Sequence, residues 1–426
     1  MSLQKYDQYK SCNCDLASQI PSHWDVVALK RLARLKSGDT ITSESIEEEG
    51  EHPVFGGNGK RGFTNAFTHN GNFPLIGRQG AHCGNINYSS GKFWASEHAV
   101  VVTPTKGLNV KWLGETLRAM NLNQYSVSAA QPGLSVDAIS KLSTPLPPEI
   151  EQKSIASFLD HETAKIDALI TEQERLIELL QEKRQAVISH AVTKGLNPNA
   201  PMKDSGVEWL GEVPEHWLIT PLKYLVTMKS GGTPSKSNLE FWDGGNIPWA
   251  SSKDLKTDKL EDTQDHITQQ AIIEGAVQIQ IKESVFICVR GMILAHTFPV
   301  VEPKQEMAIN QDLKCLIPKK ELNHEYLAIL LRGLSKEILG RVDEAAHGTK
   351  VLRIPDFSSL LVPVPPHEEQ ERIHKDIGVS NRQFERLQAH CTNSIQLLQE
   401  RRSALISAAV TGQIDVRGLD PEEESA

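Results

Sequence analysis

The sequence predicts an α+β protein of two similar halves: two globular α/β heads joined by two long antiparallel coiled-coil helices, with an internal pseudo-two-fold repeat. The segment Ile20–Thr40 returns as Val213–Thr233, at an offset of 193 residues. A second segment, Leu146–Lys194, returns as Val364–Gly412, at an offset of 218. The stretch between the repeated segments is therefore 25 residues longer in the second copy. Each half of the chain has repeated segments at its two ends and a different sequence between them. This arrangement predicts two different surfaces on one symmetric frame.

The second repeated segment is predicted to be a long helix in both copies. Two prolines open each copy, where the first helical amides have no partner in the helix. Acidic residues follow at once and complement the positive end of the helix dipole. Neither copy contains an internal proline, and glycine stops each helix, at Gly195 and at Gly412.

Apolar residues recur along both copies in alternating steps of four and three, in the same register. About 45 residues at ~1.5 Å each make a rod of roughly 65 Å, too long to be buried in one compact domain. We therefore expect the two helices to pair with each other, antiparallel if a two-fold axis relates the halves, with a head at each end. The predicted pairing residues are Ile155, Leu159, Ile166, Leu169, Leu176, Leu180, Val187, Ile373, Ile377, Phe384, Leu387, Leu398 and Leu405.

The sequence is predicted to divide into four segments. Residues 1–145 form the first head with an N-terminal segment, and residues 146–198 the first helix. Residues 199–363 are a polar connector and the second head, and residues 364–426 the second helix with an acidic tail. Short apolar runs broken by Gly, Asn, Ser and Pro predict strands within 72–80, 99–104, 284–291 and 314–318, whereas 110–120 and 324–339 read as helices.

Composition is that of an ordinary globular protein, with 39% hydrophobic and 23% charged residues. No apolar run approaches the ~18 residues of a membrane span, and the N-terminus has no apolar signal-peptide core. Six scattered cysteines suggest reduced thiols, and Cys12 with Cys14 has no second pair for zinc. We expect a cytoplasmic protein without metal or membrane contact.

Charge does not decide whether the protein binds nucleic acid. The net charge of the chain is −9, but residues 1–145 carry +2 and residues 213–363 carry −2. Most of the acidity therefore lies outside the heads. A near-neutral head can still bind DNA through a local basic face.

We find no catalytic constellation in the sequence. The GGNG at 56–59 lacks the context of a dinucleotide loop, and no phosphate-binding or H-E-x-x-H motif occurs among the fifteen histidines. His23 and His216 fall at matching places in a P-x-H-W segment, beside Trp24 and Trp217. We expect structural packing roles for all four.

Basic and amide side chains in Gly-rich loops are the candidate DNA contacts. Arg, Asn and Gln pair with base edges, Lys more often meets phosphate, and glycine lets the backbone approach a ligand. Arg78 and Arg290 each follow an apolar strand and stand before a glycine, which predicts equivalent places in the two heads. The candidates are Asn58, Lys60, Arg61, Arg78, Gln79, Lys229, Lys236, Lys253, Lys256, Arg290, Lys350 and Arg353.

The repeated motifs resemble the specificity subunit of a Type I restriction-modification system. These are the P-x-H-W…L-K…K-S-G-x-T segment and the L-P-P…E-Q…L-L-Q-E-[KR]-R…L-I-S-x-A-V-T-[GK] helix, each present twice, with KDSGVEWLGEVPEHW at 203–217. The N-terminal segment lacks the D-S-G-x-E-W-x-G form found before the second head.

The resemblance implies that each head is a target recognition domain that reads one half of a bipartite DNA sequence. It also implies that the helices form the spacer and dock two methyltransferase subunits, which restriction subunits join. S-adenosylmethionine, ATP and Mg²⁺ would then be bound by those partners, and this chain would hold no cofactor and catalyse nothing.

Two other function classes stay open. A coiled-coil adaptor without direct DNA binding would show no salt-dependent affinity for DNA. An enzyme with a nuclease or methyltransferase site in one head would act as a purified chain.

Overall fold

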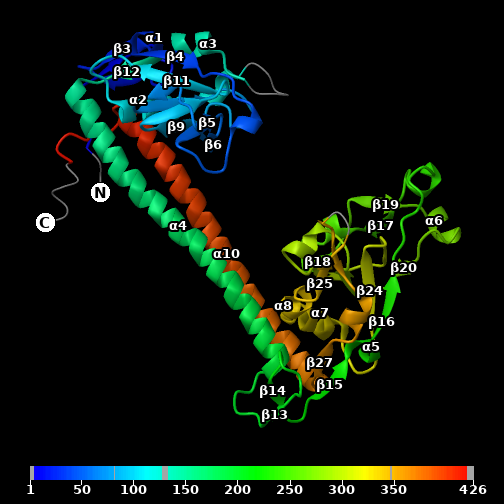
Figure 1. The fold of residues 1–426 in the computed structure, drawn as a ribbon. Coiled ribbons are helices and arrows are strands. Elements are labelled where there is room, and N and C mark those ends of the chain that lie inside the picture. The colour runs from blue at the N-terminus through cyan, green and yellow to red at the C-terminus, as the bar shows by residue number, and fades with distance from the viewer. Residues whose placement is uncertain (1–3, 81, 127–132, 346–347, 420–426) are drawn as a thin grey trace. The chain divides into compact units, whose positions relative to one another are not determined.

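The computed structural model describes residues 4–80, 82–126, 133–345 and 348–419 (Figure 1). The chain forms two compact units, each with one head and parts of both long helices. Unit 1 comprises Met1–Glu174 and Thr392–Ala426, and unit 2 comprises Arg175–Cys391. The boundary falls inside the helices α4 (Glu149–Lys194) and α10 (His367–Val410).

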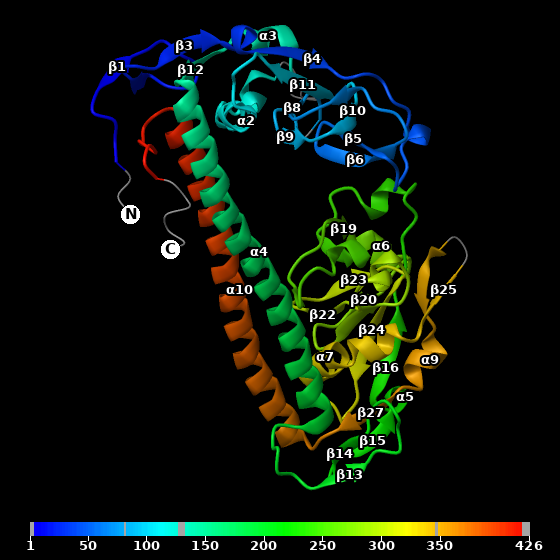
Figure 2. The same ribbon diagram turned by 60° about the vertical axis from the view of Figure 1, so that its left-hand side comes forward.

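Unit 1 contains two four-stranded sheets, in the strand orders β6-β5-β10-β7 and β4-β11-β8-β9 (Figure 2). The first consists of β5 (His52–Gly56), β6 (Gly59–Thr64), β7 (His69–Asn70) and β10 (Lys92–Ala95). The second consists of β4 (Ala33–Ser37), β8 (Phe73–Gly77), β9 (Ile86–Ser89) and β11 (Ala99–Pro104). Strand pairs and helices complete the unit: β1 (Tyr9–Ser11), β2 (Gln19–Pro21), β3 (Asp25–Ala28), β12 (Ser143–Leu146), α1 (Leu29–Leu32), η1 (Ser43–Ser45), α2 (Val110–Ala119), η2 (Leu122–Tyr125) and α3 (Val136–Lys141).

Unit 2 repeats this design with sheets in the orders β19-β17-β23-β20 and β16-β24-β21-β22-β18. Their strands are β16 (Val226–Ser230), β17 (Ile247–Ala250), β18 (Lys259–Leu260), β19 (Asp265–Ile267), β20 (Ile279–Gln280), β21 (Val285–Cys288), β22 (Val300–Pro303), β23 (Met307–Ile309) and β24 (Leu313–Pro318). Its remaining elements are β13 (Met202–Asp204), β14 (Glu212–Pro214), β15 (Leu218–Pro221), β25 (Val342–Glu344), β26 (Lys350–Leu352), β27 (Leu361–Val364), α5 (Leu222–Leu225), η3 (Leu239–Phe241), η4 (Ser252–Asp254), α6 (Gln269–Ile273), η5 (Met292–Ala295), α7 (His324–Gly333), α8 (Ser335–Leu339) and α9 (Ile354–Ser358).

Strand registers confirm the internal repeat. Ala33 pairs with Pro104 in unit 1 as Val226 pairs with Pro318 in unit 2. The central strand of each second sheet is apolar and buried, as β8 and β21 both show, because the sheet is covered on both faces. Both heads mix parallel and antiparallel pairs, as expected for α+β domains: β10 runs parallel to β5, and β17 to β23.

Most of the extra length of the second head lies in one stretch. Val54 and Trp249 occupy equivalent positions at an offset of 195, and His69 and Gln280 at an offset of 211. Sixteen of the 25 additional residues therefore fall between β17 and β20, where η4, β18 and α6 have been added. The pairing order β4-β11-β8-β9 is kept as β16-β24-β21-β22, and the added β18 extends this sheet at its edge, beside β22.

The long helices begin three residues later than predicted. Leu146 and Val364 belong to strands β12 and β27, which pair with β3 and β15. The prolines that follow end each strand, and the carbonyl oxygens of Pro148 and Pro366 accept the first helical hydrogen bonds. The predicted helix at 324–339 is divided at Leu334 into α7 and α8.

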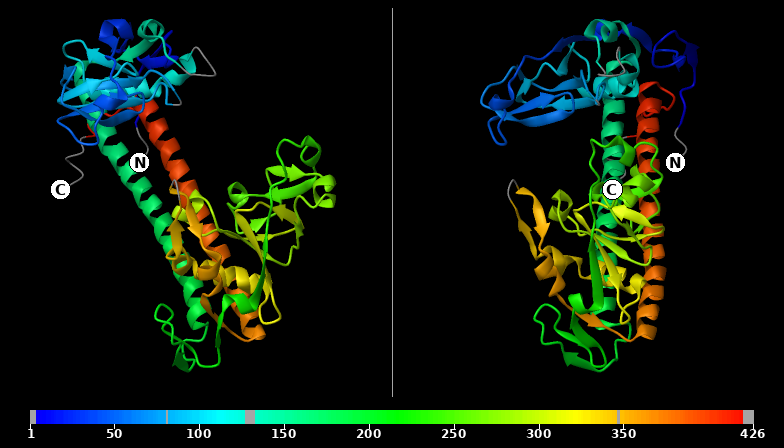
Figure 3. Two further views of the ribbon diagram at one scale, coloured as in Figure 1. Left: turned by 45° about the vertical axis from the view of Figure 1, so that its right-hand side comes forward. Right: turned by 90° about the vertical axis from the view of Figure 1, so that its right-hand side faces the viewer.

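Within each unit the α4 and α10 segments lie side by side and run in opposite directions (Figures 1, 2 and 3). In unit 1, Arg402 Nε donates to Asp167 Oδ1 at 2.8 Å, and in unit 2 Arg184 Nε donates to Asn381 Oδ1 at 3.0 Å. The helix ends enter the head cores: Ile155, Leu159, Ile406, Ala409 and Val410 in unit 1, and Ile188, Ala191, Val192, Ile373 and Ile377 in unit 2.

The predicted seam is wrong at three of its thirteen residues. Leu169, Leu176 and Leu387 expose 51%, 41% and 48% of their surfaces, so their side chains are not buried between the helices. The next residues, Ile170, Ile177 and Gln388, are half-buried instead. Adjacent apolar residues such as Leu169 and Ile170 fit either heptad phase, and both copies of the helix adopt the later one. Ile166, Leu180, Val187, Phe384, Leu398 and Leu405 are buried or half-buried.

In unit 1 the N-terminal hairpin contacts the segment that follows α10, where unit 2 has a continuous connector. The β1–β2 hairpin pairs Tyr9 with Pro21, and the β13–β14 hairpin pairs Met202 with Pro214 in the same register. In unit 1 the Tyr9 hydroxyl donates to the Gly412 carbonyl at 2.9 Å, beyond the end of α10. The N-terminal hairpin therefore keeps its packing although its sequence has lost the D-S-G-x-E-W-x-G form.

The observed seam predicts different effects for two adjacent residues. Ile170→Asp should lower the free energy of unfolding by roughly 1–3 kcal/mol, because it places a charge in the half-buried seam. Leu169→Asp should change it far less, because Leu169 is already half exposed. Urea unfolding of the purified chain followed by circular dichroism compares the two. If Leu169→Asp lowers the free energy of unfolding as much as Ile170→Asp, or more, Leu169 lies in the seam as the sequence predicted.

Candidate nucleic-acid interface

A carboxylate near the start of each long helix binds the P-x-H-W segment of its head. In unit 1 the buried Glu151 accepts from the Trp24 indole at 2.9 Å and lies 2.7 Å from His23 Nε2. In unit 2 the half-buried Glu369 accepts from Trp217 at 3.0 Å and lies 2.7 Å from His216 Nε2. Both tryptophans are fully buried, so the predicted structural roles of the histidine–tryptophan pairs are confirmed.

The next residue of each helix binds a second part of the same head. The Gln152 carboxamide accepts from the Asn109 amide at 3.1 Å, at the start of α2, and donates to the Pro147 carbonyl at 3.0 Å. Gln370 makes the same pair of contacts with Asn323, at the start of α7, and with Pro365. An adjacent Glu and Gln therefore fix the orientation of each head on its own helix segment.

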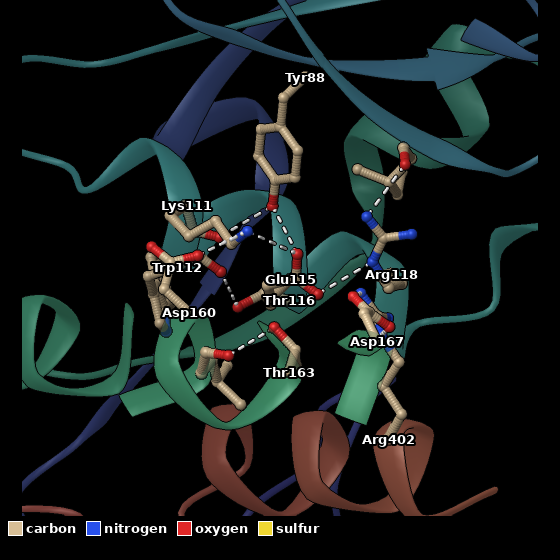
Figure 4. Close-up of polar contacts among 12 residues, drawn as sticks. Tyr88, Lys111, Trp112, Glu115, Thr116, Arg118, Asp160, Thr163, Asp167 and Arg402 are labelled. Atoms are coloured by element: carbon tan, nitrogen blue, oxygen red, sulfur yellow. Dashed lines mark hydrogen bonds and ion pairs between the residues drawn. The ribbon is translucent and has the colours of Figure 1, made fainter. Parts of the chain in front are cut away.

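One arginine on the head helix recurs in both units. Arg118 on α2 donates to the Ile86 carbonyl at 3.0 Å, and Arg332 on α7 donates to the equivalent Val300 carbonyl at 3.0 Å. Figure 4 shows Arg118 beside Glu115, whose carboxylate is buried and also accepts from Tyr88 at 2.9 Å. Lys111, on the same helix, lies 2.7 Å from Asp160 on α4.

The carboxylate that neutralises this arginine has moved between the two heads. In unit 1 it is Glu115 on the helix, and Tyr88 faces it from β9. In unit 2 Glu302 on β22 takes the place of Tyr88 and lies 3.1 Å from Arg332, while the apolar Ile329 stands where Glu115 would be. A buried charge needs a partner, but either element can supply it.

Sequence reasoning missed these anchoring residues. The signals were present: E-Q recurs at an offset of 218, and L-R at 117–118 recurs at 331–332. They read as ordinary helix residues because nothing in a single sequence shows which helical side chains face a head.

The structure brings part of the predicted set in head 1 together. Asn58 is exposed in the turn of the β5–β6 hairpin and accepts from Asn85 at 3.4 Å, in the loop that follows β8. Arg78 and Gln79 begin that loop. Lys60 and Arg61 are exposed on β6, where the Lys60 ammonium lies 3.6 Å from the Phe63 ring centre. Asn58, Arg78 and Gln79 thus belong to one group of neighbouring loops.

The set predicted in head 2 is more scattered. Lys229 is exposed on β16, Lys236 follows that strand, and Lys253 and Lys256 lie in and after η4. Lys253 is bound to Asp265 at 2.7 Å, which raises the pKa of the lysine. Arg290, Lys350 and Arg353 lie together, because Arg290 bridges to Val351 on β26. Lys350 pairs with Glu344 at 2.7 Å and Arg353 with Asp343 at 2.8 Å.

The predicted equivalence of Arg78 and Arg290 is wrong by one residue. The Arg78 amide donates to the His98 carbonyl at 2.8 Å, and in head 2 the Val289 amide donates to the equivalent Asp312 carbonyl at 2.9 Å. Gln79 bridges to Gly133 as Arg290 bridges to Val351. Arg290 therefore corresponds to Gln79, and the half-buried Arg78 corresponds to the buried Val289.

All six cysteines are buried or half-buried. Cys83, Cys288, Cys315 and Cys391 are buried. Burial raises the pKa of the Cys288 thiol to about 11, so this thiol is protonated at neutral pH and a poor nucleophile. Within the described ranges no group of three or more His, Cys, Asp or Glu is placed to hold a metal ion, and no helix is long and apolar enough to cross a membrane.

Comparison with known protein families identifies the repeated unit. The model of the family described as Type I restriction modification DNA specificity domain matches the chain twice, over residues 21–179 and 214–378. The chain belongs to this family. Each match takes in one head and the beginning of the long helix that follows it, so the specificity domain is the unit of the internal repeat.

Relatives in the specificity-domain family are subunits of restriction enzymes. The Type I restriction enzyme EcoprrI specificity subunit of Escherichia coli is 43% identical over 155 residues, which cover 35% of this chain and 38% of the relative. The EcoR124I/EcoR124II specificity subunit of the same organism is 30% identical over 173 residues, 40% of each chain. The matched segments thus span about two fifths of these two relatives.

Two further matches extend over nearly the whole chain. The Type I restriction enzyme MjaVIII specificity subunit of Methanocaldococcus jannaschii is 21% identical over 455 aligned positions, 99% of both chains. A solved structure titled for complex assembly and conformational transition of the type I R-M system matches with a TM-score of 0.68 and 14% identity, over 93% of this chain and 99% of that one. At this identity the likeness shows the fold alone.

The anchoring carboxylate gives a stability prediction. Glu151→Leu should lower the free energy of unfolding by roughly 1–3 kcal/mol, because the buried Trp24 indole N–H loses its acceptor. Glu172→Leu, at an exposed position of the same helix, is the control and should leave stability nearly unchanged. Urea unfolding monitored by tryptophan fluorescence measures both. If the two variants unfold at the same midpoint, Glu151 does not anchor the head.

Proposed function

We propose that the chain is the sequence-specific DNA-binding specificity subunit of a Type I restriction-modification complex. Each head reads one half of a bipartite target. The observation that carries this proposal is the specificity-domain match over each head, on two frames with the same strand register. A common frame with different loop residues suits two half-sites of different sequence.

The loop side chains have the chemistry that base reading needs. Head 1 offers Asn58, Arg78 and Gln79 on neighbouring loops, and head 2 offers Arg290. Amide and guanidinium groups pair bidentately with adenine and guanine edges in the major groove. The lysines of both heads suit phosphate contacts, which add affinity without sequence information.

We further propose that the long helices set the gap between half-sites and dock two methyltransferase subunits. Leu169 and its repeat equivalent Leu387 expose 51% and 48% of their surfaces, and Leu179 and its equivalent Leu397 expose 44% and 64%. Apolar side chains exposed at the same positions of both helices favour two copies of one partner. Restriction subunits join this assembly, and S-adenosylmethionine, ATP and Mg²⁺ belong to the partners.

Exchange of one head tests the reading of half-sites. Replacement of residues 21–145 by the corresponding segment of another family member should change one half of the methylated sequence and leave the other half and the gap unchanged. Methylated bases are mapped across the genome of a host that co-expresses the chain with its methyltransferase subunit. A change in both halves would contradict modular reading. Absence of any salt-dependent affinity for DNA would favour the adaptor without direct DNA contact.

The exposed leucines give a test of docking. Leu179→Asp and Leu397→Asp, singly and combined, should each weaken the complex with the methyltransferase subunit, because a charge replaces a contact in an apolar interface. Leu218→Asp, at an exposed leucine of β15, is the matched control and should not. Analytical ultracentrifugation gives the stoichiometry of each mixture. Unchanged binding of two partner copies by the double variant would place docking elsewhere.

A further inference from the structure

One position in each head has the same backbone surroundings but a different side chain. At the end of the buried strand β8, the amide and carbonyl of Arg78 are bonded to His98 and Leu134. At the end of β21, those of Val289 are bonded to the equivalent Asp312 and Leu352. The following residues, Gln79 and Arg290, each form a bridge to a neighbouring segment.

The chain turns at a glycine that directly follows Gln79 in the first head and Arg290 in the second. Gly80 has a φ of +88° and Gly291 a φ of +139°, values that side chains other than glycine rarely adopt. A backbone held by hydrogen bonds on one side and turned by glycine on the other presents its side chain from a fixed point.

The side chains of Gln79 and Arg290 are both exposed. Among the residues that the structure describes, neither the Gln79 carboxamide nor the Arg290 guanidinium has a hydrogen-bond or ion-pair partner. Their neighbours differ in this respect: Lys350 and Arg353 are paired with acidic residues, and Arg78 is half-buried. A group that reads bases must be free to exchange water for a base edge.

We propose that Gln79 and Arg290 are equivalent base-reading positions of the two heads, with Gln79 reading adenine and Arg290 reading guanine. This inference rests on the proposed function. A carboxamide donates to adenine N7 and accepts from its N6 amino group, whereas a guanidinium donates to both guanine N7 and O6. One frame thus reads two bases by exchanging one side chain at a fixed point.

Reciprocal exchange tests the inference. Gln79→Arg should convert one A·T pair of the first half-site to G·C, and Arg290→Gln should convert one G·C pair of the second half-site to A·T. The preferred pair should be favoured by roughly 5- to 150-fold at that position, with every other position unchanged. The full chain is assembled with its methyltransferase subunits, and preferred sequences are selected by binding from DNA with both half-sites randomised, so that loss of methylation does not hide the result.

Two control variants change charge alone. Gln19→Arg on β2 adds a positive charge to unit 1, and Lys259→Gln on β18 removes one from unit 2, both at exposed positions. Both should retain the original target. If Gln79→Arg and Arg290→Gln also retain it, or weaken all sequences alike, the inference is wrong although the proposed function stands. If the unaltered complex selects no sequence, the proposed function itself fails.

Discussion

The contact on which both units depend is a carboxylate of the long helix bound to the histidine and tryptophan at the start of the head. Glu151 and Glu369 make it, and the adjacent Gln152 and Gln370 hold the first turn of the head helix. Because the acceptor and the carboxamide come from consecutive residues, the head is fixed in orientation as well as position. The histidine, the tryptophan, the glutamate and the glutamine that make these contacts are identical in the two copies of the repeat.

A frame anchored in this way tolerates large changes in the rest of the head. The arginine at 118 and 332 keeps its carbonyl contact while its carboxylate moves from α2 to β22. Sixteen extra residues enter between β17 and β20 without altering the pairing of β16 with β24. The physical requirement is a satisfied buried charge and an intact central sheet, and neither depends on the loops at the sheet ends.

The sequence predicted the architecture well and individual side chains poorly. The run AVVVTP is β11 residue for residue, and 110–120 is helix α2 with one residue less. Three positions of the seam and the matching of Arg78 with Arg290 were each displaced by one residue. In both cases two adjacent residues satisfied the same pattern, and a pattern of period seven or a strand followed by glycine does not choose between neighbours.

The sequence by itself determined the two-fold repeat, the long helices and the class of each head, because these follow from periodicity and from identities at fixed offsets. The tertiary structure decided which of two neighbouring side chains faces the seam and that Gln79, not Arg78, matches Arg290. It also decided that Glu151 and Glu369 face their heads. Such choices depend on the direction of single Cα–Cβ bonds relative to a partner far away in the chain, which no local pattern records.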